Sequence, residues 1–120
     1  MLEFFDLENH NGIASIYESH ITLNKTLLKY FEDAYKVRVA FDKDDKAIYI
    51  FLINKDYALS GELPETSLMS ISTSKTYVRV CSRALIEHIC KLFALQIPKK
   101  SYLRYDAYYD EQKKAIVIKL

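Results

Sequence analysis

The sequence predicts an α+β fold in which short strands and two amphipathic helices build a single domain of 120 residues. Half of the residues are hydrophobic and 28% are charged, a balance typical of chains that bury a core. Only two Gly and two Pro residues interrupt the chain, which indicates well-formed elements joined by polar turns. The order strand, strand, helix, strand, strand occurs twice along the chain, and it organises the whole prediction.

The first copy of this pattern covers about residues 13–53. Its strands either alternate between apolar and polar residues or are continuously apolar, and they are expected at 13–17, 20–23, 36–41 and 46–53. Asn24 precedes a helix expected at 25–33, and its side chain can cap that helix by accepting a hydrogen bond from an amide of the first turn. The last strand contains AIYIFLI, which is apolar almost throughout, so we expect a central strand covered on both faces.

The second copy covers about residues 68–120, with strands expected at 68–72, 76–80, 101–109 and 115–120. A helix is expected over 82–95, after a cap at Ser82 or Cys81, and Pro98 is expected to stop it. Its apolar side chains recur at the spacing of a core-facing helix, at Leu85, Ile86, Ile89, Leu92 and Phe93. The turns DKDDK and DEQKK precede the last strand of each copy and agree in spacing and residue type.

Two segments lie outside the copies. Residues 1–12 are expected to form a lead strand, LEFFDL, which ends at the turn-forming pair Asn11-Gly12. Residues 54–67 hold Gly61 and Pro64 and show no sustained period, so they are expected to be a linker. The chain is therefore predicted to be one domain made of two intertwined repeats.

Net charge, hydropathy and the N-terminal residues bear on nucleic-acid binding, membrane insertion and secretion. The formal net charge is only +1, so any binding to nucleic acid must come from local clusters of charge. No apolar run approaches the roughly 20 residues that span a bilayer. The N-terminus carries acidic residues where a signal peptide would be basic. These features predict a cytoplasmic protein without a membrane partner, in which Cys81 and Cys90 are reduced and buried.

Catalytic and metal-binding patterns are missing from the sequence. Two glycines cannot form a phosphate-binding loop. The histidines, at positions 10, 20 and 88, have no metal-ligand spacing with the cysteines. His88 and Cys90 are two residues apart on the predicted helix and face different directions, which argues against a nucleophile and base pair. We therefore expect no enzymatic activity, no cofactor and no metal.

The residues that lead into each predicted helix resemble a sequence pattern of a known family. Residues 19–24 (SHITLN) and 76–81 (TYVRVC) occupy the place of a Gly-Arg-Ile-x-Ile-Pro run, and the hairpins end in AIYIFLI and AIVIKL. This arrangement resembles the AbrB/MraZ swapped-hairpin family over about 13–53 and 68–120. The Gly-Arg pair and the Pro are absent from both copies, and His20 stands where the family has its Arg.

The resemblance implies both a fold and a function. Two tandem β-β-α-β-β units would exchange hairpins to form one pseudo-symmetric β-barrel flanked by two helices. A unit of about 45 residues buries too little surface to be stable alone, so sharing a core is also physically expected. The implied function is that of a DNA-binding transcriptional regulator. The cations near the helix starts and ends would then contact DNA: Lys25, Lys29, Lys36, Arg38, Arg79, Arg83, Lys99, Lys100 and Arg104.

Other interpretations of the same residues remain open. The cations also fit an ordinary solvated surface, because Glu32, Asp33 and Glu87 lie among them. A protein–protein interaction module that keeps the barrel without binding DNA is the alternative function. The partner is therefore either double-stranded DNA or a protein, and the chain is either a monomer with an internal pseudo-dimer or a homodimer.

The tyrosines of residues 101–109 allow two interpretations. Alternation places Tyr105 and Tyr109 on one face of the strand, and Tyr102 and Tyr108 on the other. Exposed aromatic rings can stack on the bases of single-stranded nucleic acid. Packing inside the barrel or across strands explains the pattern at least as well.

Overall fold

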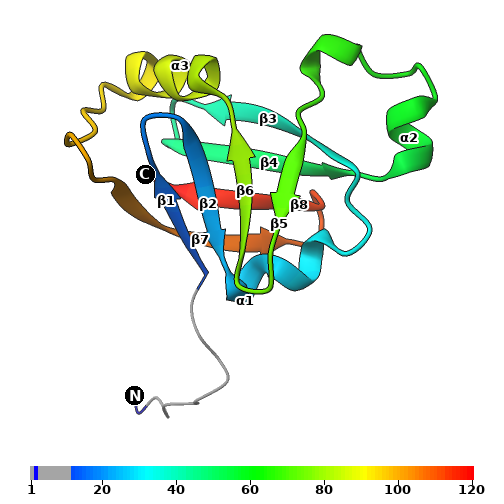
Figure 1. The fold of residues 1–120 in the computed structure, drawn as a ribbon, viewed down its shortest axis with the longest axis horizontal. Coiled ribbons are helices and arrows are strands. Elements are labelled where there is room, and N and C mark those ends of the chain that lie inside the picture. Colours follow the sequence, from blue (N-terminus) through cyan, green and yellow to red (C-terminus); the bar gives the residue numbers. More distant parts are fainter. Residues whose placement is uncertain (1, 3–11) are drawn as a thin grey trace.

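The computed structural model describes residue 2 and residues 12–120, so the lead strand expected within residues 1–12 lies outside the described residues. The described chain forms one antiparallel sheet of eight strands in the order β3-β4-β8-β7-β1-β2-β6-β5 (Figure 1). The strands are β1 (Ile13–Ile16), β2 (His20–Asn24), β3 (Lys36–Asp42), β4 (Ala47–Ile53), β5 (Ile71–Thr73), β6 (Tyr77–Cys81), β7 (Leu103–Asp110) and β8 (Ala115–Lys119). Every strand that the sequence predicts within the described residues is present, with ends that differ by a few residues.

The sheet curls until its two edge strands nearly meet. Val37 in β3 and Met69, just before β5, form an isolated bridge in which each N–H donates to the other's carbonyl, at 2.9 and 2.8 Å. Closure of this kind leaves little free strand edge. The fold is therefore a nearly closed antiparallel barrel with a few helices, which confirms the predicted α+β class.

The helices lie around the barrel and not within it. They are α1 (Lys25–Leu28), continued by the 3-10 turn η1 (Lys29–Phe31), α2 (Lys55–Leu59), the 3-10 turn η2 (Glu65–Ser67) and α3 (Arg83–Phe93). Figure 1 shows α3 along the upper end of the barrel and α1 at its lower end, while α2 projects to one side. The helix predicted at 25–33 is therefore one α-helical turn followed by a 3-10 turn. The segment predicted as a linker contains α2 and η2.

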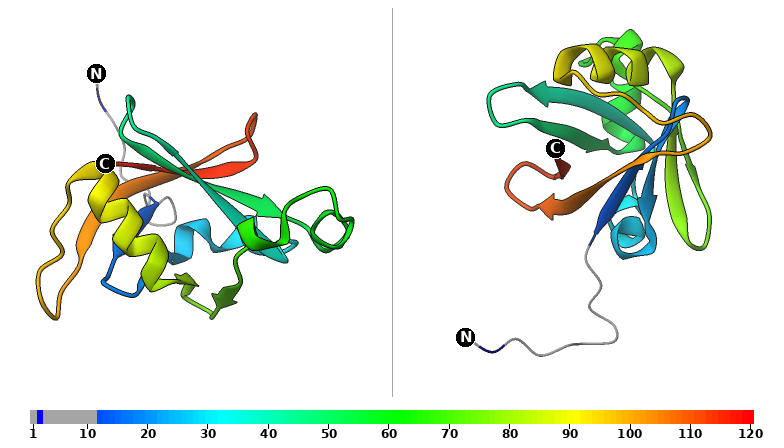
Figure 2. Two further views of the ribbon diagram at one scale, coloured as in Figure 1. Left: turned by 90° about the horizontal axis from the view of Figure 1, so that it is seen from above. Right: turned by 90° about the vertical axis from the view of Figure 1, so that its left-hand side faces the viewer.

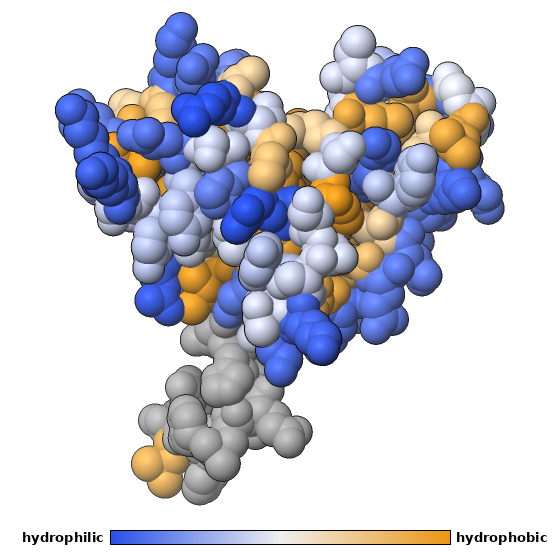
Figure 3. Space-filling model, viewed as in Figure 1, coloured by the Kyte–Doolittle hydropathy of each residue, from blue (hydrophilic) through white to orange (hydrophobic). Residues whose placement is uncertain are grey.

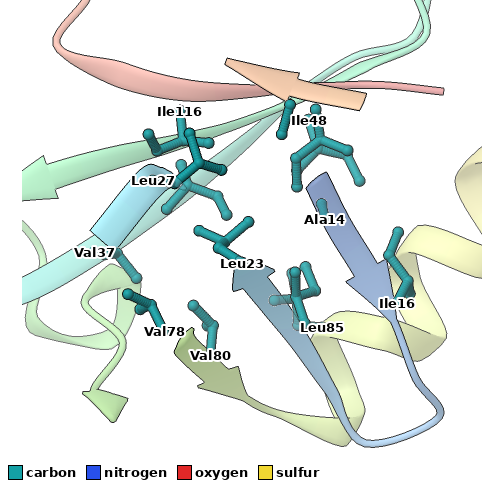
Figure 4. Close-up of a cluster of buried hydrophobic side chains, with 14 of the residues drawn as sticks. Ala14, Ile16, Leu23, Leu27, Val37, Ile48, Val78, Val80, Leu85 and Ile116 are labelled. Atoms are coloured by element: carbon teal, nitrogen blue, oxygen red, sulfur yellow. The ribbon is translucent and has the colours of Figure 1, made fainter. Parts of the chain in front are cut away.

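Alternate residues of the strands point into one shared core. Leu23, Ile48 and Ile118 are completely buried, and Leu85, Ile86 and Ile89 of α3 pack against the same interior. Figure 4 shows apolar side chains of this core, among them Leu23, Ile48 and Leu85, converging from different sides of the barrel. The predicted core-facing stripe of α3 is confirmed at these three positions, while Leu92 and Phe93 are half-buried.

The tyrosines of β7 divide between the faces as alternation predicts. Tyr105 and Tyr109 are partly buried against the core, and the ring of Tyr109 stacks on Tyr30 at 4.2 Å. Tyr102, just before β7, and Tyr108 are exposed by 42% and 46%. Barrel packing therefore accounts for Tyr105 and Tyr109.

The two faces of β4 differ in how they are covered. Ile48 and Ile50 on the inner face are completely buried. Tyr49 and Phe51 on the outer face are half-buried, and Figure 2 shows no described helix over that side of the sheet. The prediction that both faces of β4 are covered is therefore confirmed for the inner face only.

The helix ends confirm one predicted cap and correct another. Ser82 caps α3, because its Oγ accepts a hydrogen bond from the N–H of Leu85 at 3.1 Å. Asn24 makes no capping bond to α1; its Oδ1 accepts the N–H of Ile13 at 3.0 Å and so ties β2 to β1. The helix α3 ends at Phe93, with Ala94 in the left-handed region (φ 54°), well before the predicted stop at Pro98.

The cysteines also differ from expectation. Cys81 is the last residue of β6 and is exposed, so it is neither in the helix nor buried. Cys90 lies in α3 and is half-buried. Both are free thiols, as the sequence predicts.

Replacing Ser82 by Ala should lower the free energy of unfolding by about 1 kcal/mol, because the amide of Leu85 loses its acceptor at the start of α3. Urea denaturation followed by circular dichroism measures the change. Ser82→Asp is the matched control, since a carboxylate also caps, and it should retain most of the stability. Equal stabilities for Ser82→Ala and the parent chain would contradict the capping role.

Candidate functional site

A row of polar side chains crosses the outer face of five neighbouring strands. Arg104 in β7 is the Cα partner of Ser15, Ser15 of Thr22, Thr22 of Arg79, and Arg79 of Ser72 in β5. All of them point outward, because their chain neighbours point into the core. We call this row, with its extension to Lys36, the polar belt.

A side-chain hydrogen bond extends the belt across the seam of the barrel. The Nζ of Lys36 in β3 donates to the Oγ of Ser70 at 2.8 Å, and Ser70 lies two residues before Ser72. Figure 3 shows hydrophilic and weakly polar side chains, with some hydrophobic ones between them, across the middle of this face, over β1, β2, β6 and β5. The belt thus places three cations, Arg104, Arg79 and Lys36, along one row with serine and threonine residues between them.

Arg79 occupies the centre of the belt with unused hydrogen-bonding capacity. Its guanidinium lies 5.1 Å from the centre of the Tyr77 ring. Its Nε is buried and has no hydrogen-bond partner in the structure. Among residues 12–120, no carboxylate pairs with any of the three belt cations. The buried Nε is out of reach of another molecule, so an acceptor from outside, such as a phosphate oxygen, would have to approach the terminal nitrogens of the half-buried Arg79.

Aromatic rings lie beside the belt. The ring of His20 stacks on Tyr17 at 4.4 Å, and Tyr17 contacts Tyr102 at 4.9 Å. His20 Nδ1 is 3.0 Å from the Oγ of Ser19. Burial and, to a smaller extent, the nearby charge of Arg79 lower the pKa of His20 below its usual 6.5. His20 is therefore mainly neutral at pH 7 and adds little charge to the belt.

The remaining predicted cations are dispersed. Lys25 and Lys29 lie on α1 and η1 at the lower end of the barrel, where Lys29 stands 5.2 Å from the ring of Tyr30. Arg38 is the Cα partner of Phe51 and belongs to the outer face of β3 and β4.

Three further cations border the loops around α3. Arg83 is the first residue of α3, and Lys99 and Lys100 lie between α3 and β7; all three are exposed. The nine cations predicted from sequence therefore do not form one patch, and only three share the belt.

The sequence interpretation missed the uncharged members of the belt. Ser15, Thr22 and Ser72 were not singled out because small hydroxyl residues in strands are common. The alternation in HITLN and YVRVC does reveal that Thr22 and Arg79 point outward. That they are direct neighbours depends on the pairing of β2 with β6, which sequence alone does not give.

Groups suited to catalysis or metal binding are sparse in the described part of the chain. It holds no group of three His, Cys, Asp or Glu side chains placed to hold a metal ion. Burial raises the pKa of the Cys90 thiol, and the ring of His88 packs 5.0 Å from Phe41. His10 lies outside the described residues.

Comparisons of the chain with protein-family models, curated proteins and solved structures find no match. Of the helices in the described residues, none combines the length and apolarity needed to cross a bilayer.

The pKa of His20 should rise when Arg79 is replaced by Met, because the repulsion between the guanidinium and the imidazolium is removed while much of the packing stays. NMR titration of the His20 ring protons in both proteins measures this shift. In the parent chain the unfolded state binds the His20 proton more readily, so folding stability is lost as the pH falls through 6.5. A parent pKa at or above 6.5 would contradict the assignment.

Proposed function

We propose that the chain consists of two tandem β-β-α-β-β units related by a pseudo-two-fold axis, and that it binds duplex DNA through the polar belt. The pairing of β2 with β6 supports the first part. Thr22 and Arg79 stand 57 positions apart and are Cα partners. With the same difference of 57 positions, Ile21 corresponds to Val78 and Leu23 to Val80, so the flanking Cα pairs Ile21–Val80 and Leu23–Val78 are equivalent to each other. An axis through the Thr22–Arg79 pair generates this register.

The pairing of β4 with β8 supports the same axis on the other side of the barrel. Tyr49 and Val117, which are 68 positions apart, are Cα partners, and Ile48–Ile118 and Ile50–Ile116 flank them symmetrically. The turns agree as well, because Lys46 and Lys114 both have left-handed backbones, with φ of 52° and 53°. Each hairpin of one unit would thus lie beside the hairpin of the other, as in a swapped-hairpin barrel.

The symmetry is weaker at the seam. β1 pairs with β7 over four residues, whereas the corresponding contact of β5 with β3 is the single bridge between Val37 and Met69. The segment that connects the two units, which contains α2 and η2, leads into β5 at this seam. An insertion there accounts for the difference.

The belt is itself nearly symmetric about the proposed axis, and this observation carries the functional proposal. Ser15 corresponds to Ser72, and Arg104 corresponds to Lys36, at the same shifts of 57 and 68 positions. Cations therefore flank the axis on both sides, with Arg79 at the centre. Three strand spacings separate Arg79 from Arg104, about 14 Å along the sheet. Duplex DNA presents phosphates on both sides of a groove, and local cations bind them even when net charge is low.

Fluorescence anisotropy with duplex DNA of mixed sequence, titrated with salt, tests the proposal. The logarithm of the binding constant should fall linearly with the logarithm of salt concentration, by about 0.9 per phosphate contact. Arg79→Ala and Arg104→Ala should each weaken binding and reduce that slope by about one contact. Lys43→Ala is the matched control, because Lys43 is an exposed lysine in the turn between β3 and β4.

Absence of binding at low salt would contradict the DNA proposal, and so would equal losses for Lys43→Ala and Arg79→Ala. Neither outcome would affect the pairing of the two units.

A second candidate function is protein binding, and the segment between β4 and β5 favours it. Leu59 is 66% exposed and Tyr57 is 41% exposed. A groove of about 560 Å³ lies between this segment and the start of β3, lined by residues that include Tyr35, Leu59 and Leu63. Pull-down with the parent chain and a Leu59→Asp variant separates this function from DNA binding.

A further inference from the structure

His20 lies beside the centre of the polar belt. It stands two residues before Thr22 in β2, so the two side chains point outward on the same face. Its Cα partner in β6 is Cys81, which stands two residues beyond Arg79 on that face. His20 and Arg79 are therefore diagonal neighbours on adjacent strands, at a spacing of about 7–8 Å that aromatic and long side chains can bridge.

The hydrogen bonds of the ladder bring the outward side chains here close together. The N–H of Ser82 donates to the carbonyl of Ser19 at 3.1 Å, so these two residues form a hydrogen-bonded pair. Hydrogen-bonded and non-hydrogen-bonded pairs alternate along an antiparallel ladder, so the next pair, His20 with Cys81, is non-hydrogen-bonded. Side chains approach most closely in pairs of this second kind. His20 is therefore part of the same side-chain cluster as Arg79.

The imidazole ring of His20 is held by two neighbours. Its face stacks on the ring of Tyr17, with the ring centres 4.4 Å apart and the planes 17° apart. Its Nδ1 lies 3.0 Å from the Oγ of Ser19, and Nε2 has no partner among residues 12–120. In that part of the chain, the Nε of Arg79 is the one side-chain nitrogen or oxygen that is both buried and unpaired. The Nε2 of His20 therefore contacts solvent, where an acceptor from another molecule can reach it.

Arg79 is the charged group that acts on this ring. The other titratable side chains around it belong to Tyr17, Tyr102, Cys81 and the exposed Glu18 of the turn between β1 and β2. Burial and, second, the charge of Arg79 lower the pKa of His20 below 6.5. In the free chain an imidazolium is thus unfavourable beside the guanidinium, and the ring is mainly neutral at pH 7.

A phosphate bound at Arg79 would reverse this balance. Its negative charge offsets the repulsion between the guanidinium and the imidazolium, and its oxygen can accept a hydrogen bond from a protonated Nε2. The ring then holds a proton more tightly in the complex than in the free chain. Coupling between two binding events is reciprocal, so a proton on His20 also tightens the binding of the phosphate.

We propose that His20 is a fourth cation of the polar belt, one that takes up a proton as a phosphate of DNA binds at Arg79; this inference rests on the DNA binding proposed above. The affinity for DNA then rises as the pH falls. A rise of one unit in the pKa of His20 on binding increases the association constant about tenfold at pH values below the pKa of the free chain. Above the pKa of the complex the ring is neutral in both states and contributes nothing to the pH dependence.

The second unit has no equivalent of this group. At the shift of 57 positions His20 corresponds to Tyr77, whose ring lies 5.1 Å from the guanidinium of Arg79. A tyrosine cannot become a cation. Proton uptake therefore adds charge on one side of the proposed axis only, and each bound chain takes up at most about one proton.

Fluorescence anisotropy with duplex DNA of mixed sequence, at constant salt concentration, tests the proposal with the full chain. Between about pH 8 and about pH 5, the range in which histidine titrates, the dissociation constant of the parent should fall by about tenfold. His20→Gln should remove this dependence, because glutamine can donate a hydrogen bond but cannot take up a proton. His88→Gln is the matched control, since His88 is an exposed histidine on α3 that packs on Phe41, and it should keep the pH dependence of the parent.

Binding by the parent that does not change with pH would overturn this proposal and leave DNA binding through the belt intact. A pH dependence that persists in His20→Gln would also overturn it, because another group would then take up the proton. Absence of binding at every pH would contradict the proposed function, and this inference with it.

NMR titration of the His20 ring protons provides a second measurement that needs no variant. The pKa of His20 should be higher in the presence of saturating duplex DNA than in the free chain. An equal or lower pKa in the complex would contradict proton uptake at this residue, even where the affinity depends on pH.

Discussion

The structure depends on one constraint: the apolar side of each strand must be buried, and no part of the sheet has enough partners until the sheet closes on itself. The inward residues of β2 and β6 face those of β4 and β8 across a single core, in which Leu23, Ile48 and Ile118 are completely buried. Removing either side would expose the other to water, at a cost that grows with the apolar area exposed. Closure through the bridge of Val37 and Met69 follows from the same need, because it also removes most of the free strand edge.

Closure leaves only the outer surface for contacts with other molecules. With the inside filled by aliphatic side chains, recognition is left to outward positions on rigid strands. The polar belt occupies one such region, and it is built from cross-strand neighbours that lie far apart in the sequence. Arg79 illustrates the consequence, since its buried Nε has no partner and its position is fixed by two neighbouring strands.

Much of the fold could be predicted from the sequence because the information is local. Alternation in KVRVAF and SYLRYDAYY, and the polar turns DKDDK and DEQKK, identify strands and hairpins that the structure contains. The helix at 25–33 was predicted too long. The structure has one α-helical turn, Lys25–Leu28, followed by a 3-10 turn, Lys29–Phe31, and the spacing of the apolar residues along the chain fits both conformations. Asn24 was assigned as a cap on residue type alone, and the competing acceptor role toward Ile13 depends on the pairing of β1 with β2.

The candidate site was less accessible to prediction, for a related reason. Membership of the belt depends on strand register, which decides that Arg79 and Arg104 share a row while Arg38 lies beside Phe51. Charge and spacing along the chain could therefore identify the cations but not their grouping. The neighbouring hydroxyl residues Ser15 and Thr22 were missed for the same reason.

The most direct test of the account is to express residues 12–66 and 67–120 as separate fragments and record the NMR spectrum of each alone and of their mixture. Because the two halves share one core through β2–β6 and β4–β8, the account predicts poorly dispersed spectra for both fragments. Mixing should restore the dispersed spectrum of the intact chain. A fragment that folds cooperatively by itself would contradict a shared core, and with it the pairing on which the belt depends.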